Sequence, residues 1–379
     1  MQWGVYIHIP FCRQKCFYCD FPSYAGRENL MASYTEALCQ QIEIQGFSYR
    51  QKWGRPATVY IGGGTPTALP EENMAQILKA VAAYIGMGIE EFTVECNPGT
   101  VDAEYLQLLR AHGVNRLSFG VQSFNDRLLR RIGRIHTGAE AVEAVKQAQA
   151  AGFENISLDL IYGLPEQEMA DLQVSVRQAL ALDIQHISIY GLQVEEGTVF
   201  ARQQELGKLA LPAEEEAEAM YDYMTEVLPQ YGYRRYEVSN FAQAGLESRH
   251  NRSYWHDVPY LGLGAAAHSY LEGKRYAAVV DIQGYIAGIK AGTEIWQLEE
   301  EPTCQHAMEE FAFLALRTAE GLSAQAFAEK FQVSLQSVYG EVMEKLARQG
   351  LLLVEEAGCR LTEKGFKYGN VAFAEFILD

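Results

Sequence analysis

Three cysteines, Cys12, Cys16 and Cys19, are the residues whose type and spacing point most directly to chemistry. They follow an apolar run in the stretch "VYIHIPFCRQKCFYCDFPSY". Three thiolates in one short loop can hold three corners of an iron–sulfur cubane and leave the fourth iron without a protein ligand. A structural zinc site is the alternative, and it needs a fourth ligand, for which His8 is the nearby candidate. Buried structural cysteines are the third reading, although they occur singly more often than as a triplet.

The elements that must position this loop alternate between strands and helices. Short β-rich runs predict strands over 4–9, 58–61, 91–96, 116–121, 155–160 and 186–190. Helical periodicity predicts helices over 30–44, 71–84, 103–111, 139–150, 170–181 and 213–228. This alternation predicts a parallel sheet with helices on its outer face, built from six strand–helix units.

Within the predicted strands apolar and polar residues alternate, as in Val5, Ile7 and Ile9 against Tyr6 and His8. Strand residues two apart share a face, so one face is apolar under the helices and the other is polar. A closed eight-stranded barrel fills its interior with branched apolar side chains, whereas six splayed strands can keep a polar cavity. The predicted fold class is therefore α/β, a partial open (β/α)6 TIM-like barrel.

The tail of the chain changes character after an acidic run of three glutamates. Helices are predicted over 304–319, 324–331 and 335–349, and "GLLLVEEAGCRLTEKG" reads as a hairpin, which gives a smaller, mainly helical, winged-helix-like domain. The predicted organisation is a barrel over 1–230, a barrel extension over 231–298 and this C-terminal domain over 299–379. Because the tail is acidic, we expect it to pack over the barrel mouth and not to bind DNA.

Composition and charge narrow the class of protein. The net charge of −18 disfavours unaided binding to nucleic acid and favours small molecules or basic proteins as partners. No apolar run approaches the roughly 20 residues of a membrane-spanning helix, which leaves only peripheral membrane contact open. Residues 1–11 read as a first strand and not as a signal peptide. We therefore expect a cytoplasmic protein, in which clustered thiols serve metal or redox chemistry.

The cysteine stretch, C-x3-C-x2-C with Tyr18 before the third cysteine, resembles the signature of the radical S-adenosylmethionine (SAM) superfamily. Together with "GGGTPT", "VECNPG", "GVQSFND", "DLIYGLP", "YEVSNFA" and "HNRSYWHDVPYLGLGAAAHSY", it is similar to the oxygen-independent coproporphyrinogen III oxidase group over nearly the whole chain. The resemblance implies a 4Fe-4S cluster at Cys12, Cys16 and Cys19, whose open iron binds SAM. It also implies an electron donor such as a flavodoxin or ferredoxin.

The resemblance further implies which residues contact SAM. The positions that match are Tyr6, Tyr18, Gly62, Gly63, Gly64, Thr65, Glu95, Gln122, Arg134 and Asp159. From the residues alone, the glycines read equally well as a tight turn and as a place where the main chain approaches a ligand. Arg134 could likewise meet a carboxylate or be a solvated surface charge.

Two departures from the oxidase pattern bear on activity. The oxidase has a further cysteine where this chain has Phe21, and it has an N-terminal extension that precedes the first strand. Both absences are typical of the oxidase-like heme chaperones of the HemW family, and so is the His-Asn-x-x-Tyr-Trp stretch. The resemblance therefore implies a protein that binds heme and transfers it to recipient hemoproteins. The oxidase itself, which decarboxylates coproporphyrinogen III with SAM radicals, stays the alternative, so enzymatic activity is an open question at this point.

His250, in that His-Asn-x-x-Tyr-Trp stretch, is the candidate heme ligand. An exposed histidine beside Tyr254 and Trp255 could offer an axial nitrogen to heme iron while the aromatic rings cover the porphyrin. The alternative is a structural role, in which His250 and Asn251 cap a turn and the aromatic residues pack on the barrel.

Overall fold

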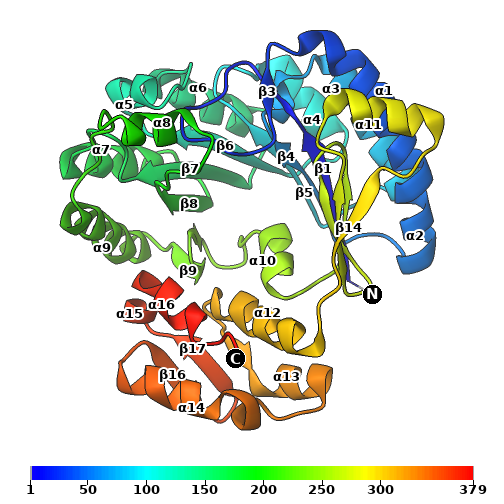
Figure 1. Ribbon diagram of the computed structural model, residues 1–379. Helices are drawn as coiled ribbons and strands as arrows, with labels where there is room; N and C mark the ends of the chain where they lie inside the picture. Colours follow the sequence, from blue (N-terminus) through cyan, green and yellow to red (C-terminus); the bar gives the residue numbers. More distant parts are fainter. Residues whose placement is uncertain (1, 379) are drawn as a thin grey trace.

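The computed structural model describes residues 2–378, and a single twelve-stranded sheet runs through the first 300 of them (Figure 1). Its centre is six parallel strands in chain order: β1 (Gly4–Ile9), β4 (Thr58–Gly63), β5 (Glu91–Cys96), β6 (Arg116–Gln122), β7 (Ile156–Tyr162) and β8 (His186–Gly191). The sheet ends at β14 (Trp296–Glu300) on one side and β9 (Arg234–Glu237) on the other. The predicted open barrel is confirmed, because these two edge strands are not paired with each other in the described chain.

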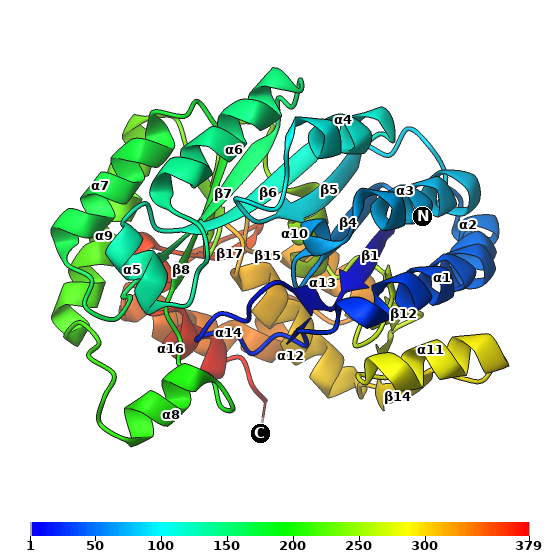
Figure 2. The ribbon, with the colours of Figure 1, turned by 90° about the horizontal axis from the view of Figure 1, so that it is seen from above.

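Helices cover the outer face of the six parallel strands (Figure 2). They are α1 (Met31–Gln41), α3 (Glu71–Ala80), α4 (Ala103–Ala111), α6 (Gly138–Ala150), α7 (Met169–Leu180) and α9 (Glu214–Gln230). The first two end earlier than predicted, because each runs into a π-helical turn, η2 (Ile42–Gly46) and η4 (Val81–Ile85). The two turns meet where Gly46 lies against Ile85; a β-carbon on Gly46 would come within 3.0 Å of the Ile85 side chain.

The alternation in the strands divides the sheet as predicted. Val5, Ile7 and Ile9 are fully buried in the core shared with the helices. The opposite face carries polar side chains into the barrel, and most of them are also buried, including the guanidinium of Arg116. Burial of this polar set requires internal partners, which the interior supplies through hydrogen bonds between neighbouring strands.

Six further strands extend the parallel sheet, and none of them was predicted from the sequence. β11 (Tyr260–Leu263) pairs parallel to β1 and is followed by the antiparallel β12 (His268–Leu271), β13 (Lys274–Ala278) and β14. On the other side, β10 (Asn240–Ala242) joins β8 to β9. These strands have three to five residues, too few for an alternating pattern to stand out.

The C-terminal domain has the predicted winged-helix-like outline. It comprises α12 (Cys304–Leu316), α13 (Ala324–Phe331), α14 (Leu335–Arg348), and the hairpin of β16 (Leu352–Glu355) and β17 (Gly358–Leu361), which β15 (Leu322–Ser323) completes. The short helices α15 (Glu363–Lys367) and α16 (Gly369–Ala374) follow. This domain has a hydrophobic core of its own, separate from that of the barrel. No helix within residues 2–378 is both long and apolar enough to cross a membrane.

Candidate iron–sulfur and SAM site

The cysteine loop is a closed structure at the carboxyl end of β1. β2 (Phe11–Cys12) pairs with β3 (Tyr24–Ala25), and the amide of Tyr24 donates to the carbonyl of Pro10 at 2.8 Å. These bonds join the two ends of the loop that carries Cys16 and Cys19. In a barrel of β/α units this is the edge where active sites are built.

The glycine-rich turn after β4 anchors that loop. The amide of Gly64 donates to Ile9 O at 2.9 Å, and the amide of Thr65 donates to Phe11 O at 2.7 Å. A β-carbon at Gly64 would lie 2.7 Å from Phe11 O and 3.1 Å from Cys12 Sγ. Glycine is therefore required here for close packing of two backbones, and these two amides serve the protein instead of a ligand.

A chain of polar contacts connects two of the cysteines. The hydroxyl of Thr65 donates to Cys12 Sγ at 3.6 Å and accepts from Asn97 Nδ2 at 3.0 Å. Asn97 Oδ1 in turn accepts from Arg134 Nη2 at 2.8 Å, while Arg134 Nη1 donates to Cys16 Sγ at 3.5 Å. Arg134 is thus a partly buried group beside the cysteine sulfur and not a solvated surface charge. Its positive charge therefore lies next to a sulfur that would be negatively charged as an iron ligand.

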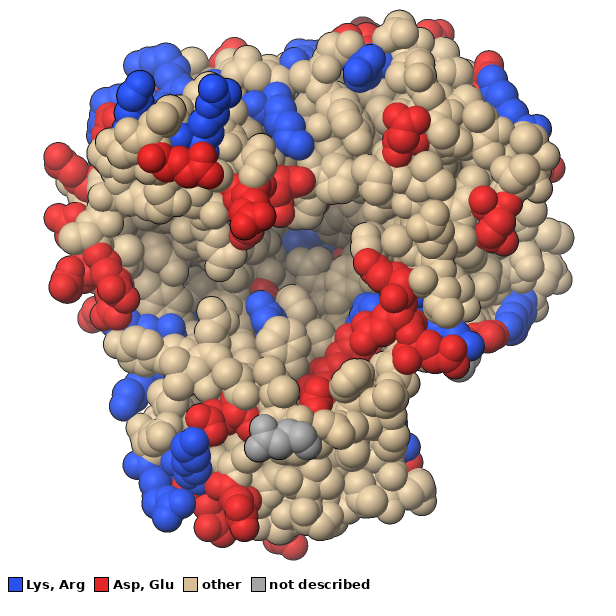
Figure 3. Space-filling view, in the orientation of Figure 1, with Lys and Arg blue, Asp and Glu red and all other residues tan. Residues whose placement is uncertain are grey.

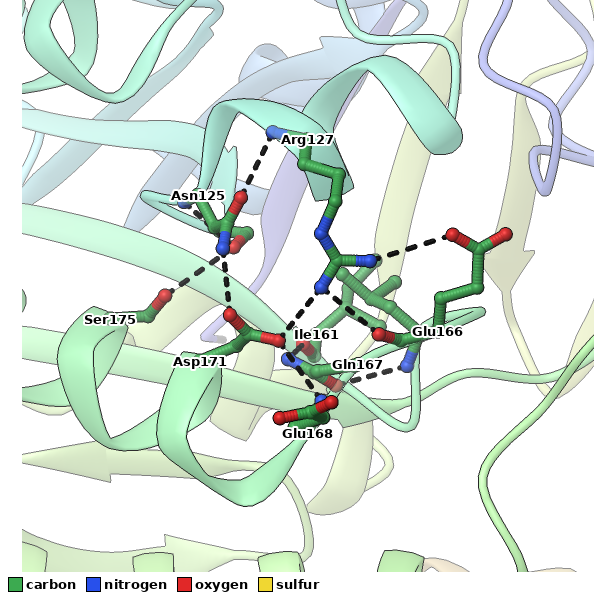
Figure 4. A network of polar contacts seen from close by, with 10 residues as sticks. Asn125, Arg127, Ile161, Glu166, Gln167, Glu168, Asp171 and Ser175 are labelled. Atoms are coloured by element: carbon green, nitrogen blue, oxygen red, sulfur yellow. Dashed lines mark hydrogen bonds and ion pairs between the residues drawn. The ribbon is translucent and has the colours of Figure 1, made fainter.

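Figure 4 shows the network that fixes α5 (Asp126–Arg131), the helix that leads to Arg134. Asn125 caps α5 by accepting from the amide of Arg127 at 2.9 Å and donates to Asp171 Oδ1 at 2.7 Å. Arg127 Nη2 pairs with Asp171 Oδ2 at 3.1 Å, and Arg127 Nη1 pairs with Glu166 at 3.4 Å. Because Asp171 belongs to α7, these contacts hold α5, α7 and the loop between β6 and α5 together.

Gln122 ends β6 in a strained position. Its φ angle is 67°, in the left-handed region that residues with a β-carbon rarely adopt, and the register with β7 shifts between Gly120 and Gln122. Its Oε1 is buried and has no hydrogen-bond partner in the described chain. Bulges and unsatisfied polar atoms of this kind cluster at binding sites, where a ligand supplies the missing partner.

Two carboxyl groups line the barrel interior below the loop. Glu95 accepts from Tyr60 Oη at 2.7 Å and from the amide of Gly63 at 3.1 Å, and its burial raises its pKa to about 7. Asp159 accepts from Ser118 Oγ at 3.4 Å, and burial raises its pKa as well. Arg116, which the sequence analysis did not single out, opposes both upward shifts in pKa by its charge.

The fourth ligand proposed for a zinc site, His8, is not free to bind a metal ion in this structure. Thiolates on one zinc lie about 4 Å apart because each Zn–S bond is about 2.3 Å. Among residues 2–378, no three His, Cys, Asp or Glu side chains converge in such a group. A cubane binds each cysteine through a different iron and so needs wider spacing. His8 is also engaged at both ring nitrogens, with Tyr6 Oη and Pro22 O at 2.9 Å each.

Comparison with known proteins places this arrangement in a family. The chain is 40% identical to the heme chaperone HemW of Bacillus subtilis (strain 168) over 99% of both chains. It is 40% identical to the same-named protein of Lactococcus lactis subsp. lactis (strain IL1403) over 99% of this chain and 97% of that one. This chain belongs to the HemW family. The Haemophilus influenzae relative is 34% identical over 99% and 98% of the two chains.

Family models and a solved structure agree with the HemW assignment. The model of the radical SAM superfamily matches residues 6–179, and the HemN C-terminal domain matches 303–367. The solved coproporphyrinogen III oxidase HemN of Escherichia coli superposes with a TM-score of 0.85 over 99% of this chain and 90% of that one. At 22% identity, that likeness shows a shared fold alone.

The fold brings the predicted SAM residues of this HemW family member to the loop edge and the upper interior of the barrel. Tyr18 lies beside Cys16 and Arg134, and Tyr6 stacks on Tyr60, the partner of Glu95, with ring centroids 6.2 Å apart. Asn97 was not predicted to be a site residue, although it stands in the quoted "VECNPG" motif. The signal available in the sequence was a side-chain amide directly after a strand, but its link to the cysteines depends on contacts across the sheet.

His250, the candidate heme ligand, lies in a different environment from the one expected. An exposed side chain was expected, whereas the side chain is buried in α10 (Arg249–Trp255). Its ring nitrogens contact Thr58 Oγ1 and Tyr254 Oη, each at 2.8 Å, and the ring stacks on Tyr60. Burial lowers its pKa to about 3. A neutral histidine with both nitrogens bonded offers no free lone pair to heme iron in this conformation.

Proposed function

We propose that this protein is a heme chaperone, which binds heme and transfers it to recipient hemoproteins. The observation that carries the proposal is the identity of about 40% to curated HemW proteins across the full length of both chains. The coproporphyrinogen III oxidase is related to this chain at the level of the fold. Where the oxidase pattern has an additional cysteine, this chain has the exposed Phe21.

The protein carries a radical SAM-type 4Fe-4S cluster and a SAM site. We place the cluster at Cys12, Cys16 and Cys19, supported by the closed loop and by the hydrogen bonds to Cys12 and Cys16. For SAM we retain the predicted set, with the buried acceptor of Gln122 and the carboxyl groups of Glu95 and Asp159 as polar partners for its ribose and amino groups. Asn97 joins them as the residue that links Thr65 to Arg134.

We propose further that an acidic electron-transfer protein, such as a flavodoxin or ferredoxin, docks at the cysteine loop. Segments 11–30 and 125–136 together hold seven Lys or Arg and three Asp or Glu, a net charge of +4 in a chain of −18. Arg127 and Arg131 of this set pair with Glu166, while Arg13 and Lys15 flank the cysteines on the exposed loop. Reduction of the cluster should therefore slow as ionic strength rises. None of the seven cysteines forms a disulfide in the described chain, which supports a place in the reducing cytoplasm.

The test is a set of three measurements on the purified protein. Anaerobic reconstitution should incorporate iron and sulfide, and replacement of Cys12, Cys16 and Cys19 by serine should prevent it. Hemin titration should give a shifted Soret band, and loaded protein should activate a heme-free acceptor hemoprotein. Incubation with reductant, SAM and coproporphyrinogen III should give no protoporphyrinogen. Formation of that product without heme transfer would instead establish the oxidase.

A further inference from the structure

Rings from three separate segments of the chain stack inside the barrel. Tyr6 of β1 lies against Tyr60 of β4, with ring centroids 6.2 Å apart and ring planes at 29° to each other. His250 of α10 lies against the same Tyr60 ring, with centroids 5.0 Å apart and planes at 21°. Tyr60 is therefore the shared ring of a stack that connects α10 to the sheet.

Helix α10 is anchored at the amino ends of β4 and β5. Glu91, the first residue of β5, accepts from the amides of Arg249 and His250 at 2.7 and 3.0 Å. Thr58, the first residue of β4, contacts one ring nitrogen of His250 through Oγ1 at 2.8 Å. Tyr254 Oη contacts the other ring nitrogen at 2.8 Å. The backbone amide and the ring of His250 are thus both bound, which makes this ring a rigid support for Tyr60.

Tyr60 passes this support on to the carboxyl group of Glu95. Its Oη donates to Glu95 Oε1 at 2.7 Å, while the amide of Gly63 donates to Oε2 at 3.1 Å. A β-carbon at Gly62 would lie 2.7 Å from the Tyr60 ring and 2.9 Å from the carboxyl carbon of Glu95, so the first glycine of "GGGTPT" makes room for this pair. A carboxylate has about four acceptor positions, which leaves about two of them for a ligand.

The two ends of this chain of contacts differ in their access to a ligand. Tyr60 and Glu95 are only partly buried, whereas His250 is 1% exposed. Figure 3 shows that the molecule is hollowed between the barrel and the C-terminal domain. A ligand inside the barrel can therefore reach the carboxyl group of Glu95, and His250 acts on that ligand only through its neighbours.

Tyr6 extends the stack toward the cysteine loop. Its Oη lies 2.9 Å from His8 Nδ1, and His8 Nε2 lies 2.9 Å from the carbonyl oxygen of Pro22, which belongs to that loop. A β-carbon at Gly63 would overlap the ring of His8, so the second glycine of the motif makes room for this contact. Because the stack also contacts the cysteine loop, the iron content of each variant has to be measured together with its affinity for SAM.

We propose that His250 is a positioning residue of the SAM site, where its ring holds Tyr60 and Tyr60 in turn directs Glu95 at SAM. The proposal rests on the SAM residues proposed above, because His250 acts through Glu95. A carboxyl group that is already held in place loses less conformational entropy when it binds a ligand. The His-Asn-x-x-Tyr-Trp stretch then serves cofactor binding, and this role requires no contact with heme.

The experiment measures the affinity for SAM by equilibrium dialysis with anaerobically reconstituted protein. Glu95→Gln should weaken binding about 10- to 100-fold, the range for a hydrogen bond to a charged group. Tyr60→Phe keeps the stacked ring and removes the hydroxyl, and it should weaken binding about 3- to 10-fold. His250→Ala should weaken binding by a similar factor, because the side chains of Tyr60 and Glu95 are then ordered only when SAM binds.

Two further variants distinguish positioning from a general loss of packing. In a Glu95→Gln background, His250→Ala should cause no further loss of affinity, because the residue through which it acts is already changed. His250→Phe keeps a ring that can stack on Tyr60, so it should recover part of the affinity that His250→Ala loses. Equal losses from His250→Ala in both backgrounds would overturn the proposal.

Tyr233→Phe is the matched control for Tyr60→Phe. Tyr233 is also a tyrosine of the barrel whose hydroxyl donates to a backbone carbonyl, that of Ile184, and it belongs neither to the stack nor to the SAM residues. This variant should bind SAM as the wild type does.

The outcomes separate this proposal from those on which it rests. Unchanged affinity for SAM in folded His250→Ala, with weakened binding in Glu95→Gln, would overturn the positioning role and leave the SAM residues in place. Unchanged affinity in Glu95→Gln would remove Glu95 from the SAM site and the proposal with it. If His250→Ala does not fold, unchanged affinity in Tyr60→Phe would overturn the proposal instead. Heme titration is a separate measurement, so the chaperone function stands or falls independently.

Discussion

Replacing His250 by alanine separates a buried structural histidine from a heme ligand. The change removes the contacts to Thr58 and Tyr254, each at 2.8 Å. Each hydrogen bond contributes about 1 kcal/mol, and the stacked ring of Tyr60 loses a partner contributing about 0.5–1.5 kcal/mol. With the cavity left behind, we expect a loss of about 3 kcal/mol in the free energy of unfolding.

The assay is thermal unfolding together with heme titration below the transition. With an unfolding entropy of about 2.1 cal/mol/K per residue over the barrel and its extension, a loss of about 3 kcal/mol lowers the melting temperature by about 5 °C. The Soret maximum of the heme-loaded variant, measured while it is folded, should match that of the wild type. His112→Ala is a control on the outer face of the barrel, where the ring bonds only the Leu108 carbonyl within its own helix turn. An unchanged melting temperature with a displaced Soret maximum would refute this reasoning and return His250 to the role of ligand.

Three further predictions follow from the site and its surroundings. Burial lowers the pKa of His250 to about 3 and that of His136 to about 4, so as the pH falls from 6.5 to 4 the unfolded chain binds protons at these positions that the folded chain does not, and both histidines lower the free energy of unfolding. Burial raises the pKa of Glu95 and of Glu237 to about 7, so these two carboxyl groups act in the opposite direction over the same window. The contribution of His250 is therefore obtained from the difference between wild type and His250→Ala. At pH 4 His250 alone should lower the free energy of unfolding by about 3 kcal/mol. The measurement is denaturant unfolding of wild type and of His250→Ala across this pH range. Equal pH slopes in the two proteins would contradict this prediction. Gly64→Ala should lower iron incorporation on reconstitution, because the added β-carbon would lie 2.7 Å from a backbone oxygen. The control, Gly340→Ala, should keep full iron content, because its β-carbon would meet only the flexible end of Gln336. Full iron content in Gly64→Ala would show that the turn can shift. Arg134→Gln should destabilise the assembled cluster more than Arg134→Lys, because it removes the charge beside Cys16; equal rates of cluster loss in air would argue against an electrostatic role.

Much of the fold followed from local patterns. The period-two alternation in β1 and β5 and the helical periodicity between strands are properties of neighbouring residues, so the open barrel could be predicted without contacts. The cysteine triplet could be predicted as an iron–sulfur site for the same reason, since its three ligands share one short loop. β9 to β14 could not be predicted, because short strands acquire their pairing from the sheet they join.

Tertiary structure decided the environment of single side chains. Spacing left Arg134 equally compatible with solvent and with a carboxylate, and only the fold of α5 against the loop placed it beside Cys16. His250 was expected at the surface from its polar, aromatic neighbours, yet helix α10 turns it inward onto Thr58, a residue 192 positions away. The sequence alone determined which chemistry the chain can perform, because that depends on residue types and local spacing. Burial and partner choice depend on segments distant in the chain, and those were decided only when the sheet and the two domains came together.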